Sequence, residues 1–341
     1  MRKIVIDENI PFLRGLLEPW FDVVYAERID AATVRDAEAM LIRTRTHCDE
    51  RLLAGSAMEF IGTATIGFDH IDMEYCHTQG IEVATAAGCN ARAVMQYLAS
   101  ALVHLARKQG WSPGVKTLGV IGVGHVGSLV ARLGCACGFR VVCCDPPEMR
   151  RDPSLGYLPL EEVLAQADII TCHVPLNRQG IDRTLGMADD GFFRRMKPGA
   201  VFINTSRGEI VEDPALAVAI RNGRLSDVVL DVWNHEPAID PELAEMVTYG
   251  TTHIAGYSMQ GKANGSSMVV RALARKYGLP LTEWYPEGVP LQVTDRPISW
   301  PMLQETIDGY FDIGAEDARL RGHAGCFEEL RNTYKYREEY F

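Results

Sequence analysis

Short apolar runs alternate with amphipathic segments along most of the chain. In the N-terminal part the apolar runs are KIVID, DVVYA, AMLIR, EFIGT and IEVAT, and pieces such as IPFLRGLLEPW and RLLAG lie between them. Strands that alternate with helices are typical of a parallel β-sheet covered by helices. We therefore predict an α/β domain here, completed by a helix that follows Gly261.

The pattern changes at Asn90, where alanine and leucine recur at helical spacing as far as Gln109. This predicts one long helix that leads into a second α/β series. The strand-like runs of that series are TLGVIGVG, FRVVCCD, DIITCHVP, AVFINTS, DVVLDVW and TTHIAG. Such runs, separated by helical segments, predict a doubly wound, Rossmann-like sheet that binds its ligands at the carboxyl ends of the strands.

A chain of 341 residues has room for two or three domains. We expect a discontinuous substrate or lid domain of flavodoxin-like α/β type from residues 1–91 and 257–280, with the Rossmann-like domain inserted at 92–256. The tail, 281–341, is richer in proline, aromatic and charged residues and leaves the βα rhythm, so we expect a small separate α+β domain there. The ligand site is then expected in a cleft between the first two domains.

Composition and charge exclude several classes of protein. With 47% apolar and 23% charged residues, the chain is an ordinary globular protein. Its net charge of −11 disfavours binding to nucleic acid or to anionic membranes, so an anionic substrate needs a local basic pocket. No apolar run approaches a membrane span, the N-terminus lacks a secretion signal, and the cysteines lack metal-ligand spacing. We expect a cytoplasmic protein with reduced thiols and no metal.

A glycine-rich motif follows the first strand of the second series. GVIGVGHVGS places Gly122, Gly124 and Gly127 in G-x-G-x-x-G spacing. The first glycine permits a tight turn, the second lets the backbone approach a pyrophosphate, and the third allows close packing of helix and strand. Asp145 ends the next strand, where an acid accepts hydrogen bonds from ribose hydroxyls and repels a 2′-phosphate. The motif predicts NAD rather than NADP, and the alternative is a glycine-rich turn without a nucleotide.

Three polar residues follow later strands of the same series: Arg207 in NTSRGEI, Glu236 in DVWNHEP and His253 in TTHIAG. Because parallel strands share a carboxyl edge, we expect them to face one crevice. Arg207 can grip a carboxylate in two charge-assisted bonds, and His253 can take a hydroxyl proton as hydride leaves the same carbon. Glu236 can orient the imidazole and stabilise its protonated form.

Each of these residues also has a structural interpretation. His253 could be a histidine satisfied in the core, Glu236 a loop acid before Pro237, and Arg207 a surface ion pair. His235, next to Glu236, is a less favoured candidate, because adjacent side chains in an extended loop tend to point apart. Their common position after the cofactor motif favours the catalytic interpretation.

The pieces GVGHVG, NTSRGEIV, DVWNHEP and THIAG, in this order, resemble the D-isomer-specific 2-hydroxyacid dehydrogenase family. The resemblance implies that Arg207, Glu236 and His253 are catalytic, that NAD is the cofactor and that the protein is a homodimer. The cofactor contacts expected are Gly122, Gly124, His125, Val126, Gly127, Asp145, Val174, Thr205, Ser206, Asp231 and Gly256.

The pieces IDENIP, LIRT, GTATIGFDHID, GCNARAV and THIAGYSMQGKA are similar to one branch of that family, which oxidises 4-phospho-D-erythronate on the route to pyridoxal phosphate. The similarity implies that the tail mediates dimerisation and that the residues contacting this small phosphorylated hydroxy acid include Thr44, Thr65 and Tyr257. Arg43 and Arg45 are our candidates for the substrate phosphate, with Lys262 as a further one; a solvated basic pair is the alternative.

Two other functions stay open at this point. A relative acting on 3-phosphoglycerate or glycerate would share the cofactor motif and the catalytic trio. An NAD-sensing binding protein would need the cofactor-binding fold but no catalytic residues. The joint presence of Arg207, Glu236 and His253 argues against it.

Overall fold

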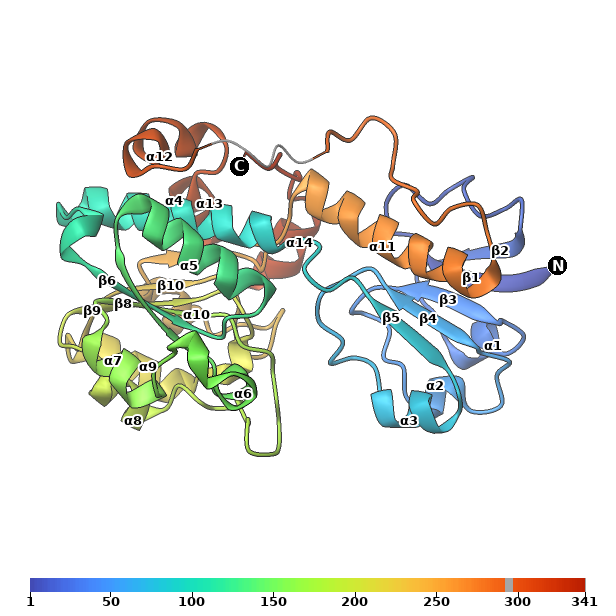
Figure 1. The fold of residues 1–341 in the computed structure, drawn as a ribbon, viewed down its shortest axis with the longest axis horizontal. Helices are drawn as coiled ribbons and strands as arrows, with labels where there is room; N and C mark the ends of the chain where they lie inside the picture. Colours follow the sequence, from blue (N-terminus) through green and yellow to red (C-terminus); the bar gives the residue numbers. More distant parts are fainter. Residues whose placement is uncertain (292–296, 341) are drawn as a thin grey trace. The chain divides into compact units, whose positions relative to one another are not determined.

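The computed structural model describes residues 1–291 and 297–340. It divides into two compact units (Figure 1). The first unit comprises Met1–Asn90 and Ser258–Gln292, and the second comprises Ala91–Tyr257 and Val293–Phe341. The chain therefore leaves the first unit, builds the second and returns, as an inserted domain requires.

The first unit is built on a five-stranded parallel sheet with the strand order β2-β1-β3-β4-β5. This order is the flavodoxin-like one. The strands are β1 (Arg2–Asp7), β2 (Phe21–Ala26), β3 (Ala39–Ile42), β4 (Phe60–Thr63) and β5 (Glu82–Thr85). The helices are α1 (Ala31–Val34), α2 (Glu50–Leu53), α3 (Met73–Thr78) and α11 (Met259–Tyr277).

Helix α11 covers one face of this sheet, because Val269, Val270 and Leu273 are buried in the cluster that holds Ile4 and Leu41. The helices α1 to α3 cover the other face. Thus the segment after residue 257, remote in sequence, completes the core of the N-terminal sheet.

One expected helix of this unit is absent. IPFLRGLLEPW forms a series of turns between β1 and β2. Proline at positions 11 and 19 removes two backbone donors, and Phe12 and Gly15 adopt positive φ values of 69° and 83°, which a helix does not permit. The apolar side chains Leu13 and Leu17 are nevertheless buried, so the helical periodicity reflected core contacts made by turns.

The second unit contains a six-stranded parallel sheet with the order β11-β10-β9-β8-β6-β7. The strands are β6 (Thr117–Ile121), β7 (Arg140–Cys144), β8 (Ile169–Cys172), β9 (Ala200–Asn204), β10 (Leu225–Leu230) and β11 (Tyr249–Gly250). The chain progresses outward from β6 in both directions, so β6 and β8 flank the switch point at which such sheets bind ligands. The last strand ends before Thr251, so TTHIAG is a loop and not the strand that the sequence predicts.

Helices cover both faces of this sheet (Figure 1). On one face lie α4 (Ala91–Gln109) and α5 (His125–Cys137). On the other lie α7 (Leu160–Gln166), α8 (Asp190–Arg195), α9 (Asp213–Arg221) and α10 (Pro241–Met246), while α6 (Pro146–Arg151) follows β7. Within the part of the chain that the structure describes, no helix is both long and apolar enough to cross a membrane.

The C-terminal segment packs on the second unit. Its helices are α12 (Trp300–Thr306), α13 (Ile313–Leu320) and α14 (Phe327–Asn332), and residues 297–340 contain no strand. Ile307 and Phe311 are buried against α4, and the ring of Phe311 lies 5.3 Å from that of Tyr97. Leu320 and Phe327 are buried instead in the cluster on the other face of the sheet. The segment thus differs from the separate α+β domain that we expected, because its buried apolar residues join the two cores of the second unit.

Candidate active site

The glycine-rich turn follows β6 and leads into α5. Gly122 has a φ of 85°, and a Cβ atom there would lie 2.8 Å from the backbone of His173. A Cβ atom on Gly127 would lie 1.9 Å from the carbonyl oxygen of Gly122. Neither position admits a side chain, so the turn closes tightly between β6, α5 and the loop after β8.

The space beside this turn fits a dinucleotide. A Cβ atom on Gly124 would meet nothing within 4 Å, and α5 begins at the next residue. The first amides of a helix lack intrahelical acceptors and attract anions such as a pyrophosphate. Asp145 lies at the carboxyl end of β7, and its two oxygens accept from the amides of Val123, at 2.8 Å, and Glu148, at 3.1 Å. The carboxylate is thereby fixed where the sequence predicts the ribose.

The other predicted cofactor residues lie on neighbouring segments of the second unit. A Cβ atom on Gly122 would lie 2.9 Å from Cγ1 of Val174, so Val174 adjoins the turn. His125 and Val126 open α5, Thr205 and Ser206 follow β9, and Gly256 follows the loop of His253.

His173, which the sequence did not single out, sits between two of these segments. Its Nε2 atom lies 3.0 Å from the hydroxyl of Thr171, and its Nδ1 atom lies 3.4 Å from that of Thr205. Burial lowers the pKa of His173 to about 3. The imidazole is therefore neutral near pH 7 and acts as a hydrogen-bonding spacer in the loop after β8.

Arg207 projects from the loop after β9, which Asn204 organises. The amide nitrogen of the Asn204 side chain donates to the Arg207 carbonyl at 2.8 Å, and its oxygen accepts from the amide and the hydroxyl of Ser206. A Cβ atom on Gly208 would lie 2.0 Å from the carbonyl group of Trp233. This close approach locks the Arg207 loop against the loop after β10, which carries Glu236.

Glu236 and His253 form the central pair of the site. Nδ1 of His253 lies 2.8 Å from Oε2 of Glu236, and Oε1 accepts from the amide of Trp233 at 2.9 Å. A carboxylate only accepts, so Nδ1 carries the proton and Nε2 presents a lone pair. The His253 side chain is 30% exposed, so the imidazole is not closed off in the core.

Two opposing effects act on the carboxyl group of Glu236. Burial raises its pKa, whereas the His253 imidazole, the Trp233 amide and the Arg331 guanidinium lower it, and the net pKa is below the ordinary value. Glu236 is therefore ionised near neutral pH and can stabilise a protonated imidazole.

The backbone holds His253 in an uncommon conformation, with a φ of 59°. The amide of His253 donates to the carbonyl of Asp231 at 2.8 Å. The Asp231 carboxylate accepts from the amides of Ile254 and Ala255, at 2.8 and 2.9 Å, and from the Thr251 hydroxyl at 2.7 Å. A left-handed residue costs about 1 kcal/mol or more and persists where its surroundings determine it. Asp231, expected from the sequence at the cofactor, thus anchors the histidine loop in the structure.

Two arginines of the C-terminal segment also reach this region. Arg331 donates from Nε to the hydroxyl of Tyr257 at 3.1 Å, and its Nη1 atom lies 3.9 Å from Oε2 of Glu236. Arg337 donates to the carbonyls of Ile254, Ala255 and Tyr257. Sequence reasoning missed both residues, because no motif marks them and their role depends on how the tail packs.

The candidate substrate residues of the first unit follow its strands. Thr44 follows β3, and Thr65 follows β4 with its hydroxyl 2.7 Å from that of Thr63. Arg43 binds the Asp7 carboxylate through Nε and Nη2, at 2.9 and 3.1 Å. Arg45, Lys262 and the two threonines thus belong to the first unit, whereas the trio and Tyr257 belong to the second.

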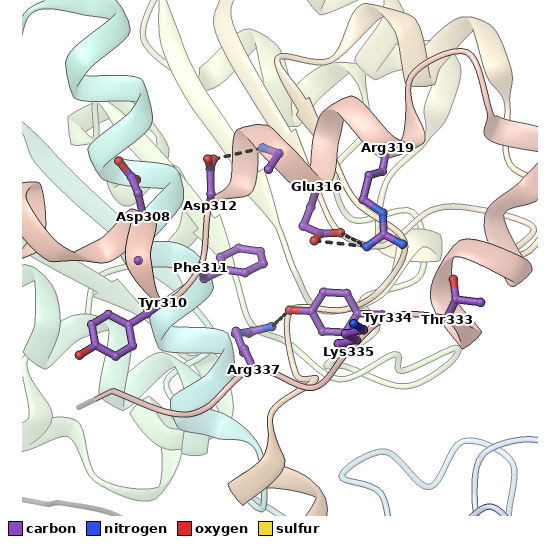
Figure 2. A pocket seen from close by; sticks show the side chains of 12 residues that line it. Asp308, Tyr310, Phe311, Asp312, Glu316, Arg319, Thr333, Tyr334, Lys335 and Arg337 are labelled. Carbon is purple, nitrogen blue, oxygen red and sulfur yellow. Dashed lines mark hydrogen bonds and ion pairs between the residues drawn. The ribbon is translucent and has the colours of Figure 1, made fainter.

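A cavity of about 490 Å³ lies elsewhere in the second unit, between α13 and the segment that follows α14 (Figure 2). Both of its arginines have partners: Arg319 binds Glu316 at 3.0 Å, and Arg337 donates to Tyr334 at 3.1 Å. None of the residues predicted from the sequence lines it.

Comparison with known proteins identifies related sequences. The family model described as the D-isomer specific 2-hydroxyacid dehydrogenase NAD binding domain matches residues 89–255. Erythronate-4-phosphate dehydrogenase of Bacteroides fragilis is 44% identical over 340 residues, which cover 99% of this chain and 97% of that protein. The Escherichia coli O127:H6 protein of the same name is 39% identical over 355 residues, covering 99% and 92%.

Solved structures share the fold. D-lactate dehydrogenase from Aquifex aeolicus, complexed with NAD and lactic acid, has a TM-score of 0.67 and 26% identity, with 81% of this chain and 96% of that chain covered. D-mandelate dehydrogenase from Rhodotorula graminis has a TM-score of 0.67 and 22% identity, covering 85% and 99%. Both are matched almost completely, whereas part of the present chain extends beyond them.

Proposed function

The chain belongs to the D-isomer-specific 2-hydroxyacid dehydrogenase family, in its erythronate-4-phosphate dehydrogenase branch, and from that premise we propose its reaction. It oxidises 4-phospho-D-erythronate to (R)-3-hydroxy-2-oxo-4-phosphooxybutanoate with NAD, in the biosynthesis of pyridoxal 5′-phosphate. The observation that carries the proposal is the 44% identity over 99% of the chain, tail included, to an enzyme of that name. The 2.8 Å contact of Glu236 with His253 supplies the chemistry.

NAD is the cofactor of this domain. The open position at Gly124, the N-terminus of α5 and the carboxylate of Asp145 fit its pyrophosphate and ribose. When bound, NAD supplies the hydride acceptor. Asp145 favours it over NADP, because its charge repels a 2′-phosphate.

We assign the substrate carboxylate to Arg207. Its guanidinium presents planar, paired donors to two carboxylate oxygens. The Asn204 side chain and the close approach of Gly208 to Trp233 fix the loop from which it projects. An arginine held in place orients the carbon that carries the reacting hydroxyl, and this orientation of the substrate increases the rate of hydride transfer.

His253 acts as the general base. Nε2 accepts the proton of the 2-hydroxyl group as hydride leaves the same carbon, so an alcohol becomes a ketone and one proton remains on the imidazole. Glu236 holds the Nδ1 proton and stabilises the imidazolium that forms. In the reverse direction the imidazolium returns the proton to the new hydroxyl.

The first unit supplies groups for the remainder of the substrate. Thr44 and Thr65 offer hydroxyls, and Arg45 and Lys262 offer positive charge for the phosphate. Arg43 already pairs with Asp7, so its charge is partly neutralised. The variant Arg45→Ala is expected to raise KM about tenfold or more, because one charge-assisted contact with the substrate is lost. The effect on kcat is expected to be smaller. An unchanged KM would remove Arg45 from the phosphate site.

A substrate panel tests the proposed reaction. Purified protein is given NAD or NADP together with 4-phospho-D-erythronate, 3-phosphoglycerate or glycerate, and NADH or NADPH formation is followed by absorbance. The highest kcat/KM is expected when 4-phospho-D-erythronate is paired with NAD. Preference for 3-phosphoglycerate or glycerate would support the other family members, and NADH binding without turnover of any substrate would support a cofactor-sensing protein.

We also propose that the protein is a cytoplasmic homodimer and that the C-terminal segment contributes to the interface. Tyr310 and Tyr336 of this segment are large, exposed aromatic side chains, and such residues are enriched at interfaces. Light scattering coupled to gel filtration tests this: the double variant Tyr310→Ser, Tyr336→Ser is expected to weaken a dimer, and a wild-type monomer at micromolar concentration would reject it.

A further inference from the structure

We propose that Arg331 is a positioning residue of the active site: from helix α14 of the C-terminal segment, its guanidinium holds the hydroxyl of Tyr257 and lies beside the Glu236 carboxylate that orients His253. The inference rests on the proposed function, because it assigns Arg331 a part in that reaction. It makes the C-terminal segment a component of the site.

The contacts of Arg331 are directed at the site and not at solvent. Its side chain is only 19% exposed, and that of Glu236 is 18% exposed. Nε donates to the Tyr257 hydroxyl at 3.1 Å, and the guanidinium lies 5.7 Å from the centre of the same ring. One side chain thus fixes both the hydroxyl and the aromatic face of Tyr257.

Tyr257 is held from the C-terminal segment on further sides. Its ring lies 6.2 Å from that of Tyr334 and 5.9 Å from that of Tyr336, both in edge-to-face geometry. Its carbonyl accepts from Arg337 at 3.1 Å. Tyr257 lies four residues after His253 on the same loop, so the C-terminal segment braces the part of that loop which faces the substrate.

The charge of Arg331 bears on the catalytic pair. Among the residues that the structure describes, the His253 imidazole contacts the Glu236 carboxylate at 2.8 Å, from the loop after β11, and the Arg331 guanidinium lies 3.9 Å away, on α14. Tyr257 faces Arg331 from the same loop as His253. A cation next to the carboxylate keeps it ionised, and it also opposes protonation of the neighbouring imidazole.

This arrangement predicts the direction in which the pH profile of kcat/KM moves when Arg331 is replaced. In the oxidation direction His253 must be unprotonated to accept the hydroxyl proton. Removing the Arg331 charge favours the protonated imidazole, so the acid limb of the kcat/KM profile moves to higher pH, by about half a unit or more. Loss of a merely structural contact would lower the amount of folded protein without moving that limb.

The test compares Arg331→Met and Arg331→Lys with the control Arg319→Met. Arg319 lies on α13 of the same segment, its side chain is 41% exposed, and it pairs with Glu316 in the cavity of Figure 2, so its removal matches the change in charge. Two readouts are taken for each variant. The first is steady-state oxidation of the substrate 4-phospho-D-erythronate, which gives the pH profile and the Michaelis constant. The second is the NMR titration of the His253 ring proton, assigned with His253→Asn, and it needs no turnover, so it separates this inference from the proposed reaction.

Arg331→Met is expected to move the titration midpoint and the acid limb to higher pH and to raise KM about tenfold through the released Tyr257. Arg331→Lys restores the midpoint but not KM, because lysine keeps the charge and loses the guanidinium geometry. Tyr257→Phe raises KM alone, and in the Arg331→Met background it adds little, as coupled residues require. Arg319→Met matches the wild type.

A folded Arg331→Met protein whose midpoint and KM both equal those measured in the Arg319→Met control would overturn the inference. If Arg331→Met does not fold, Arg331→Lys decides: an unchanged midpoint with a raised KM supports the inference, and a wild-type KM contradicts it. A wild-type protein that does not oxidise 4-phospho-D-erythronate refutes the proposed reaction, and the NMR titrations then still decide whether Arg331 sets the state of the pair.

Discussion

Oε2 of Glu236 lies 2.8 Å from Nδ1 of His253, and this contact sets the tautomer of the imidazole. The carboxylate belongs to the loop after β10 and the histidine to the loop after β11, two neighbouring strands of the second sheet. Because both strands end at the same edge of the sheet, the two side chains meet, and the carboxylate orients the imidazole as a general base requires.

Glu236→Gln is expected to move the acid limb of the oxidation profile to lower pH, by about one unit. The reason is that the carboxylate stabilises the protonated imidazole, and an amide does so less well. The measurement is kcat/KM against pH, with the exposed Glu242→Gln as the matched control. A limb that stays in place in Glu236→Gln would show that the carboxylate does not control the base.

Glu236 also links stability to pH. Its pKa in the folded protein is below the ordinary value, so its contribution is fully present above the unfolded pKa, about 4.3, and is lost as pH falls through the lower folded pKa. Glu236→Gln should therefore cost about 1 to 2 kcal/mol near pH 7, and the difference should shrink toward zero in acid. Urea unfolding at several pH values checks this, and an equal difference at all pH values would argue against an ionised Glu236.

Substitutions at two glycines of the turn after β6 are expected to affect different properties, cofactor binding in one case and folding stability in the other. Gly124→Ala meets no atom within 4 Å and should fold normally, but its methyl group occupies the approach to the pyrophosphate. NADH fluorescence titration should show affinity weakened about tenfold or more. Gly127→Ala, whose Cβ would lie 1.9 Å from a carbonyl oxygen, should instead lower the free energy of unfolding. Normal NADH affinity in Gly124→Ala would place the pyrophosphate elsewhere.

Arg337 stabilises the loop that carries the site. It is 8% exposed, lies over the Phe311 ring and donates to the carbonyls of Ala93, Ile254, Ala255 and Tyr257. Arg337→Met leaves several buried acceptors unpaired, so a loss of about 3 kcal/mol or more in unfolding free energy is expected. Chemical denaturation measures it, with the exposed Lys335→Met as control. Similar stabilities of the two variants would contradict the bracing role.

Much of the second unit could be predicted from the sequence, because its signals are local. The G-x-G-x-x-G spacing reports a turn in which a Cβ atom on Gly127 has no room, and the polar residues after apolar strands report the carboxyl edge of a parallel sheet. That these polar residues lie at one edge could be predicted from the strand pattern alone, without knowing which residues distant in sequence are in contact.

The remainder depends on contacts that local patterns do not encode. Leu13 and Leu17 suggested a helix, although turns with positive φ at Phe12 and Gly15 bury them. The histidine loop looked like a strand because Thr251, Thr252 and Ile254 are apolar or β-branched, whereas Asp231 holds that segment in a loop. The contacts of Arg331 with Tyr257 and Glu236 arise only from the way the C-terminal segment packs within the second unit.

The most direct test of His253 as the general base is the turnover of His253→Asn against His235→Asn. His253 and His235 have positive φ values of 59° and 60°. Asparagine tolerates that conformation, so both substitutions place asparagine in the same kind of backbone geometry. We predict that His253→Asn retains NADH binding and loses about 10²-fold or more in kcat with 4-phospho-D-erythronate as substrate, while His235→Asn stays near wild type. A His253→Asn protein with near wild-type kcat would contradict the assignment of His253 as the base.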